Sequence, residues 1–250
     1  MTKYLDSLFW DLVNEKSELF NKLIDNGIIN YNAVLEILLN EGDPTKLYRF
    51  AKYINKVSKE DKIRIADKII ERGTTAFIVY YAKDVLDAPI ELLEDAIIKS
   101  GSLEYEYEFA KDVKGANISR LEDAIISRGS AEYIFRFALN VSDANINKLA
   151  RAITKTDDSK YICLFVMNIP DLDLSLFDDT LVRIGNIDDY KKFLEYKIRI
   201  QDEYYSKLCS SIKDNDIEDL ELNKERYAYL FKEPSVKAKV LIKKFNDRGY

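Results

Sequence analysis

The side chains of this sequence that could do chemistry are carboxylates, Lys and Arg cations, and two thiols. The chain has 44 Asp and Glu residues and 38 Lys and Arg residues, but no His. It therefore lacks the commonest general base and the commonest metal ligand, and a Cys–His nucleophile is impossible. Cys163 and Cys209 lie far apart in the chain, which is not the spacing of a zinc site. Carboxylate-based glycosylase or nuclease chemistry is the enzymatic alternative that remains.

Two patterns that often hold ligands fail here. Asp171, Asp173 and Ser175 begin like a calcium-binding loop, but Leu176 and Val182 stand where that loop needs a turn Gly and a bidentate Glu. With eight Gly residues, the chain has no Gly-rich phosphate-binding loop. We therefore expect no catalytic residue, no metal site and no cofactor, and we predict that the protein is not an enzyme.

Acidic side chains that recur at one repeated position are the first candidates for partner binding. They are Glu36, Asp67, Asp95, Asp123 and Asp179, and Arg151 interrupts the series. At 100° per residue this position lies opposite the apolar stripe of its segment, so the side chains should face solvent. On one interpretation they only keep the helices soluble. On the other they form a row of carboxylates that attracts a basic protein partner.

A second series with the same spacing consists of Asp84, Asp112, Asn140 and Asn168. Each residue stands one position before an apolar residue near the end of a segment, where its side chain is expected to bind the backbone of the next loop. Recognition of a ligand is the alternative. Tyr and Phe residues recur on the same segments, and we expect them to pack between repeats rather than form a stacking surface.

The charge of the chain is unevenly distributed. Residues 224–250 hold eight basic and three acidic residues, a net charge of +5, so the rest carries −11 of the total of −6. The basic residues that suit contacts with nucleic-acid phosphates are Lys237, Lys239, Lys243, Lys244 and Arg248. The simpler interpretation is a C-terminal capping helix whose lysines complement an acidic body.

The elements that must position these residues are revealed by a repeat. Leu93-Glu-Asp-Ala-Ile-Ile98 recurs almost unchanged as Leu121-Glu-Asp-Ala-Ile-Ile126. Gly73, Gly101, Gly129 and Gly185 fall on the same 28-residue grid that these two copies define, with Asp157 in the remaining slot. A fixed period of this size indicates stacked units of supersecondary structure.

Each unit is predicted to be two short helices. In one unit, Ser119 and Glu122 fit a capping box at the start of the first helix, Gly129 fits its left-handed end, and Ser130 fits the N-cap of the second. The second helix carries an apolar quartet at i, i+3, i+4 and i+7. The four clearest quartets are Leu47/Phe50/Ala51/Ile54, Ile78/Tyr81/Ala82/Val85, Ile134/Phe137/Ala138/Val141 and Ile162/Phe165/Val166/Ile169.

These paired helices, with a Gly between them and an apolar quartet on the second, resemble the HEAT-like class of α-helical repeats. The resemblance implies a binding role and no particular activity. We predict an all-α protein, an α-solenoid of about six antiparallel helix pairs over residues 33–202. Residues 1–32, with Trp10, would form an N-terminal cap, and residues 203–250 a C-terminal cap with the basic tail.

The function that best fits this architecture is non-enzymatic binding of a protein, because stacked repeats make a long surface. The partner would be a protein of unknown identity with a basic surface. The chain would act on it as an inhibitor or an adaptor, for example as a phage-encoded antagonist of a host protein. The alternative is a nucleic-acid binder that uses the basic C-terminal segment. No apolar stretch approaches the roughly 20 residues of a membrane span, and we expect a cytoplasmic protein.

Overall fold

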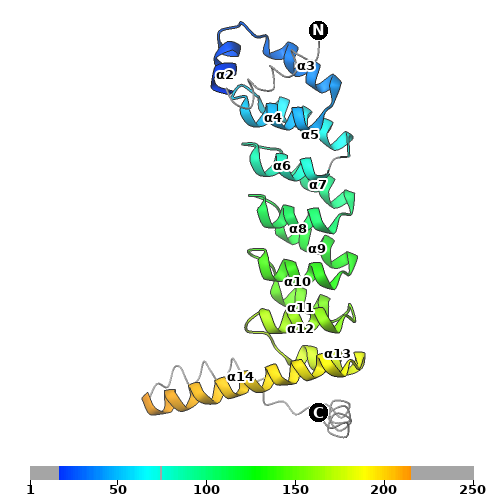
Figure 1. The fold of residues 1–250 in the computed structure, drawn as a ribbon, viewed down its shortest axis with the longest axis vertical. Helices are drawn as coiled ribbons and strands as arrows, with labels where there is room; N and C mark the ends of the chain where they lie inside the picture. The colour runs from blue at the N-terminus through cyan, green and yellow to red at the C-terminus, as the bar shows by residue number, and fades with distance from the viewer. Residues whose placement is uncertain (1–16, 74, 215–250) are drawn as a thin grey trace. The chain divides into compact units, whose positions relative to one another are not determined.

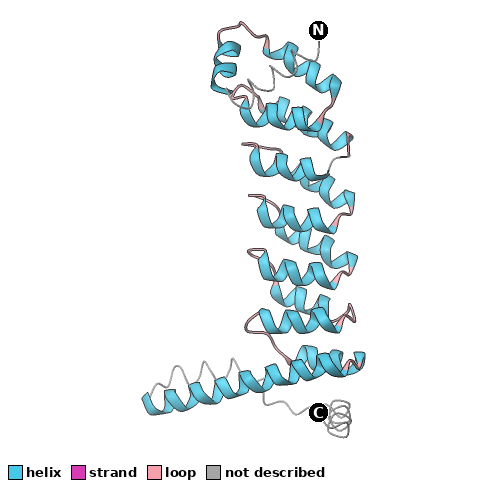
Figure 2. Cartoon of the chain, viewed as in Figure 1, coloured by secondary structure: helices cyan, strands magenta, loops and turns pink. Residues whose placement is uncertain are grey.

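The computed structural model describes residues 17–73 and 75–214, which form thirteen helices and no strand (Figure 1; Figure 2). From α3 onward they form six consecutive pairs, joined within each pair by links of two to five residues. The predicted all-α class is therefore confirmed. The helices are α2 (Ser17–Asp25), α3 (Tyr31–Glu41), α4 (Pro44–Tyr53), α5 (Lys59–Glu71), α6 (Thr75–Asp84), α7 (Ile90–Ser100), α8 (Leu103–Asp112), α9 (Ile118–Arg128), α10 (Ala131–Asn140), α11 (Ile146–Ile153), α12 (Ser159–Asn168), α13 (Ser175–Ile184) and α14 (Ile187–Asp214).

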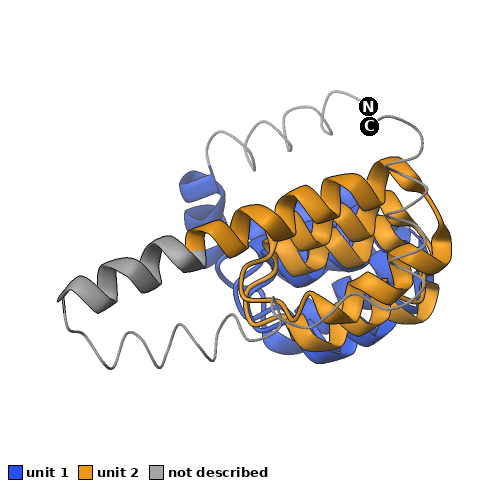
Figure 3. Ribbon diagram, turned by 90° about the horizontal axis from the view of Figure 1, so that it is seen from below, with its two compact units in different colours: residues 1–124 blue, residues 125–250 orange. Residues whose placement is uncertain are grey.

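The chain divides into two compact units, Met1–Ala124 and Ile125–Tyr250, and the division falls within α9 (Figure 3). In the first unit α6 packs against α4 and α8, and α5 packs against α3 and α7. In the second unit α12 packs against α10 and α14, while α11 contacts α10 and α12, and α13 contacts α12 and α14. Each unit is therefore a stack of helix pairs, the α-solenoid arrangement that the repeat predicts.

The apolar quartets of the second helices form the core of each stack. All sixteen residues of the four predicted quartets are buried, as expected. Full burial of one Phe, Leu or Ile side chain contributes about 1.5–3 kcal/mol, so each quartet contributes substantially to stability, together with buried first-helix residues such as Leu93 and Leu121. In α8 the quartet departs from the pattern, because Glu106 takes the buried position that Ile134 and Ile162 occupy in α10 and α12.

The predicted left-handed ends of the first helices are confirmed. Gly73, Gly101, Gly129 and Gly185 have φ angles of 69°, 74°, 70° and 75°. Asp157, which stands in the remaining slot of the grid, adopts the same conformation with φ of 56°. Gly takes this conformation without steric cost, and Asp is one of the few other residues that tolerate it. The repeat therefore keeps a backbone conformation even where it changes the residue.

A second left-handed position recurs in the loop that leads from one helix pair to the next. Its members are Asp87, Gly115, Asp143 and Asp171, which follow the same period along the chain, with φ between 53° and 86°. This series was not predicted from the sequence. The signal that would have revealed it was present, because a position that alternates between Asp and Gly is typical of left-handed backbone.

The predicted capping box at Ser119 is wrong. Helix α9 begins at Ile118, so Ser119 lies inside its first turn, and the carboxamide of Asn117 accepts the capping hydrogen bond from the backbone N–H of Arg120 at 3.2 Å. Ser130 is the N-cap residue of α10, as predicted, but its hydroxyl does not make a capping hydrogen bond. The starts of α9 and α10 were thus predicted to within two residues, but the side chains that make the capping hydrogen bonds were not predicted correctly.

Parts of the predicted domain organisation lie beyond what the structure describes. The predicted boundaries at residues 32/33 and 202/203 fall inside α3 and α14, respectively. Trp10 and the N-terminal residues before Ser17 lie outside the described residues, as do the residues after Asp214. The division into caps and repeats therefore stays a prediction. None of the helices in the described ranges is long and apolar enough to cross a membrane.

Candidate functional site

The five predicted partner-binding carboxylates are all exposed, as their position on the helices predicts. In the first unit, Glu36 lies on α3, Asp67 on α5, Asp95 on α7 and Asp123 on α9. Asp179 lies on α13 of the second unit, and Arg151, which interrupts the series, is exposed on α11. The structure thus presents the first unit's carboxylates on the first helices of successive pairs.

Arginines from the following pair neutralise part of this series. Arg64 on α5 donates a hydrogen bond to Glu36 at 2.6 Å, and Arg120 on α9 donates one to Asp95 at 2.6 Å. The hydrogen bond to Glu36 raises the pKa of Arg64. Asp67 forms no ion pair or side-chain hydrogen bond within the described part of the chain. Asp67 is therefore a carboxylate whose full charge remains available to a partner.

Two large apolar side chains stand exposed beside the Glu36–Arg64 ion pair. Ile37, the chain neighbour of Glu36, is 65% exposed, and Ile63, the neighbour of Arg64, is 44% exposed. We call the five residues Glu36, Ile37, Ile63, Arg64 and Asp67 the α3–α5 patch. Protein interfaces combine apolar side chains with a charged rim, and this patch has both.

The Glu of the repeated Leu-Glu-Asp-Ala-Ile-Ile motif has a role that the sequence analysis missed. Glu94 is only 2% exposed, and its Oε2 accepts a hydrogen bond from the backbone N–H of Asn117 at 2.7 Å. Its Oε1 lies 3.1 Å from the guanidinium of Arg120. Glu94 therefore binds the start of the first helix in the next pair, and its neighbour Asp95 in the same motif stays exposed.

The second polar series was predicted to bind loop backbone, and this is wrong in all four cases. Asp84 accepts hydrogen bonds from Lys52 at 2.7 Å and from the Tyr48 hydroxyl, and Asp112 accepts one from Lys83 at 3.0 Å. Burial by itself would raise the pKa of Asp84, but the hydrogen bonds from Lys52 and Tyr48 hold that pKa below its ordinary value.

The two amides of that series bind their own helices instead. Asn140 donates to the Arg136 carbonyl at 3.0 Å, and Asn168 donates to the Leu164 carbonyl at 2.8 Å. The polar series thus links neighbouring second helices in the first unit, through Lys–Asp pairs, and makes only local bonds in the second. None of these four side chains points to a ligand site.

The aromatic residues of the second helices pack between repeats, as expected. The Tyr48 and Phe77 rings of α4 and α6 lie 6.1 Å apart, and the Phe135 and Tyr161 rings of α10 and α12 lie 6.4 Å apart. Tyr80 joins the first of these clusters at 5.9 Å from Phe77, and it is 48% exposed. Edge-to-face and tilted contacts of this kind stabilise the stack beyond the area they bury.

Cys163, on α12, is a buried free thiol. Its thiol donates a hydrogen bond to the Asp189 carbonyl at 3.2 Å, and burial raises its pKa to about 12. A thiol with this pKa is protonated at neutral pH and is a poor nucleophile. Among the described residues, no group of three or more Cys, Asp or Glu side chains is arranged to hold a metal ion.

The basic residues predicted to contact nucleic acid, from Lys237 to Arg248, lie outside the described residues. The candidate site that the structure describes is therefore the α3–α5 patch in the first unit. Its exposed carboxylates were predicted from the sequence, and its exposed isoleucines were not. Comparison of the chain with protein-family models, with curated proteins and with solved structures finds no match.

Proposed function

We propose that the protein is a non-enzymatic protein–protein interaction module that binds its partner through the α3–α5 patch. The observation that carries the proposal is the exposure of Ile37 and Ile63, the chain neighbours of the ion-paired Glu36 and Arg64. Full burial of an exposed Ile contributes about 1.5–3 kcal/mol, and a partner that covered the remaining exposed area of Ile37 and Ile63 would gain a part of this from each.

The charge of the patch favours a partner that presents a basic group beside an apolar one. Asp67 lies one turn after Arg64 on α5 and has no cation of its own within the described residues. A carboxylate at the rim of an interface speeds association with a basic partner more than it tightens the final complex. Binding without catalysis would make the protein an inhibitor or an adaptor of that partner.

Two further parts of the proposal rest on the sequence. The paired helices and their left-handed Gly residues support membership of the HEAT-like class. The presence of only two Cys, one of them a buried free thiol, supports a reducing location such as the cytoplasm.

Affinity capture with the full chain, followed by identification of bound proteins by mass spectrometry, tests the proposal. The Ile37→Asn/Ile63→Asn double variant should lose the captured partner and melt at the wild-type temperature. Leu86→Asn is the matched control, because Leu86 is 79% exposed in the loop after α6 and lies outside the patch. Equal capture by wild type and the double variant would contradict the assignment of the site.

With the partner identified, association rates measured at two salt concentrations test the role of Asp67. Asp67→Lys should slow association several-fold at low salt and have a smaller effect at high salt, because salt screens exposed charges. An unchanged rate at low salt would mean that Asp67 is only a solvated side chain. Binding of polyanions by the wild-type chain at low salt would instead favour the nucleic-acid alternative.

A further inference from the structure

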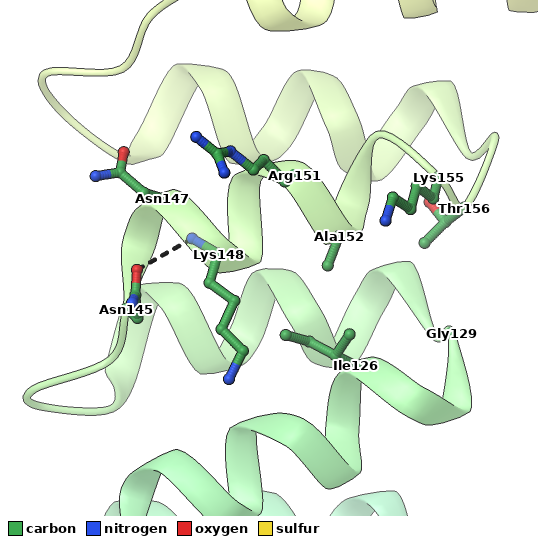
Figure 4. A pocket seen from close by; sticks show the side chains of 9 residues that line it. All are labelled: Ile126, Gly129, Asn145, Asn147, Lys148, Arg151, Ala152, Lys155 and Thr156. Carbon is green, nitrogen blue, oxygen red and sulfur yellow. Dashed lines mark hydrogen bonds between the residues drawn. The ribbon is translucent and has the colours of Figure 1, made fainter.

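A cavity of about 470 Å³ lies in the second unit, between the C-terminal part of α9 and helix α11 (Figure 4). Ile126 of α9 and Ala152 of α11 form its apolar wall. Three cations from one segment line it as well: Lys148, Arg151 and Lys155. Not one of the described residues that line this cavity is acidic, although the chain as a whole carries a net charge of −6.

Two of the three cations lie on α11 and the third lies just after it. Lys148 and Arg151 stand at positions i and i+3 of α11 and so share a face, and Lys155 lies in the turn two residues after the helix ends. Asn147 adds an amide at the edge of the cavity. A ligand in the cavity therefore meets positive charge at several points rather than at a single one.

Two of these cations have no carboxylate partner. Arg151 and Lys155 form no ion pair within the described ranges. Arg183, one repeat after Lys155, is by contrast paired with Asp157 at 2.6 Å. The position of Arg151 itself is acidic in α5, α7, α9 and α13. Arg151 and Lys155 therefore bring uncompensated positive charge to the lining of the cavity.

We propose that this cavity binds a small organic anion that carries two or more phosphate groups. Its volume lies in the range of sites for small molecules, about 300–1,000 Å³. A single carboxylate is matched by one cation, whereas linked phosphates present several negative charges, which suits a lining with more than one cation. The Ile126 and Ala152 wall suits an apolar or aromatic group attached to the phosphates. This proposal does not rest on the function proposed for the first unit.

Isothermal titration of the full chain with ADP, inorganic pyrophosphate and adenosine tests the proposal. We expect ADP to bind, pyrophosphate to bind several-fold more weakly because it leaves the apolar wall uncovered, and adenosine not to bind. The Arg151→Gln/Lys155→Gln variant should weaken ADP binding at least tenfold, and Arg151→Lys should weaken it less than Arg151→Gln. Lys160→Gln is the matched control, because Lys160 is an exposed cation of the same unit that does not line the cavity.

The double variant removes only exposed side chains from the surface, so its melting temperature should equal that of the wild type and loss of binding can be attributed to the site. Failure of both ADP and pyrophosphate to bind the wild type would overturn the proposal. Equal weakening by Lys160→Gln and by the double variant would also overturn it, because it would indicate nonspecific attraction. Tighter binding of a hexaglutamate peptide than of ADP would overturn it as well and assign the cavity to acidic peptides.

Discussion

Glu94 on α7 accepts a hydrogen bond from the backbone N–H of Asn117, 23 residues later, at 2.7 Å, so one helix pair caps the first helix of the next. Hydrogen bonds to charged groups contribute about 1.5–3 kcal/mol, and Glu94 is buried. We expect Glu94→Ala to lower the free energy of unfolding by about 2 kcal/mol, and Glu94→Gln to lower it less because the amide oxygen still accepts. Urea denaturation measures both. Asp95→Ala is the control, since it removes an exposed ion pair and should cost less than about 1 kcal/mol.

Gly129→Val should destabilise the protein by on the order of 1–3 kcal/mol, because a β-branched residue is strained at a φ of 70°. No heavy atom lies within 4 Å of the position a Cβ would take, so the cost comes from the backbone and not from a clash. Gly129→Asn, which tolerates this conformation, should cost much less. Thermal melting of the two variants measures the difference, and equal midpoints for both would show that backbone strain is absent.

Phe137→Ala should cost about 3–5 kcal/mol, the range for truncating a large aromatic side chain in a core. Phe137 is completely buried in α10. Leu139→Ala, two residues later on the same helix, removes a side chain that is 46% exposed and should cost much less. If Phe137→Ala left the denaturation midpoint unchanged, its assignment to the core would be wrong.

Cys163 should resist alkylation by iodoacetamide at pH 8 in the folded protein and react once the protein is unfolded in urea. Burial raises the pKa of its thiol to about 12, so the thiolate that reacts is scarce at pH 8. Because the folded pKa is above that of an unfolded Cys, raising the pH from about 8.5 toward 12 should destabilise the fold through this group. Peptide mass spectrometry reports the modification of Cys163, and rapid labelling of the native protein would contradict the prediction.

The repeat in the sequence predicted the helices well because the apolar spacing and the terminal Gly residues that indicate each helix lie within one short segment. The quartet of Ile134, Phe137, Ala138 and Val141 lies within one short segment, and its spacing alone determines the face that is buried. The left-handed ends at Gly101 and Gly129 are likewise a property of one residue. The exposure of the acidic series, including Asp67, followed from the same spacing.

The interactions between pairs were not predicted, because they join residues that the sequence separates. Spacing within one helix favoured Glu122 as part of a local capping box, whereas the equivalent Glu94 reaches the next pair, 23 residues away. Lys52 and Asp84 are 32 residues apart, and nothing in either segment identifies the other as a partner. The exposure of Ile37 beside Glu36 was missed for the same reason, since only the arrangement of neighbouring helices decides which apolar side chains are left uncovered.

Two series of left-handed residues, one within each helix pair and one between pairs, give successive repeats similar φ angles at equivalent points. A stretch cut out between such points, for example from Asp87 to Gly115, would join two left-handed positions. We therefore expect that a whole repeat can be deleted or duplicated without designing a new loop. Chain length in this architecture is adjustable in steps of one whole repeat, and shorter insertions are confined to loops.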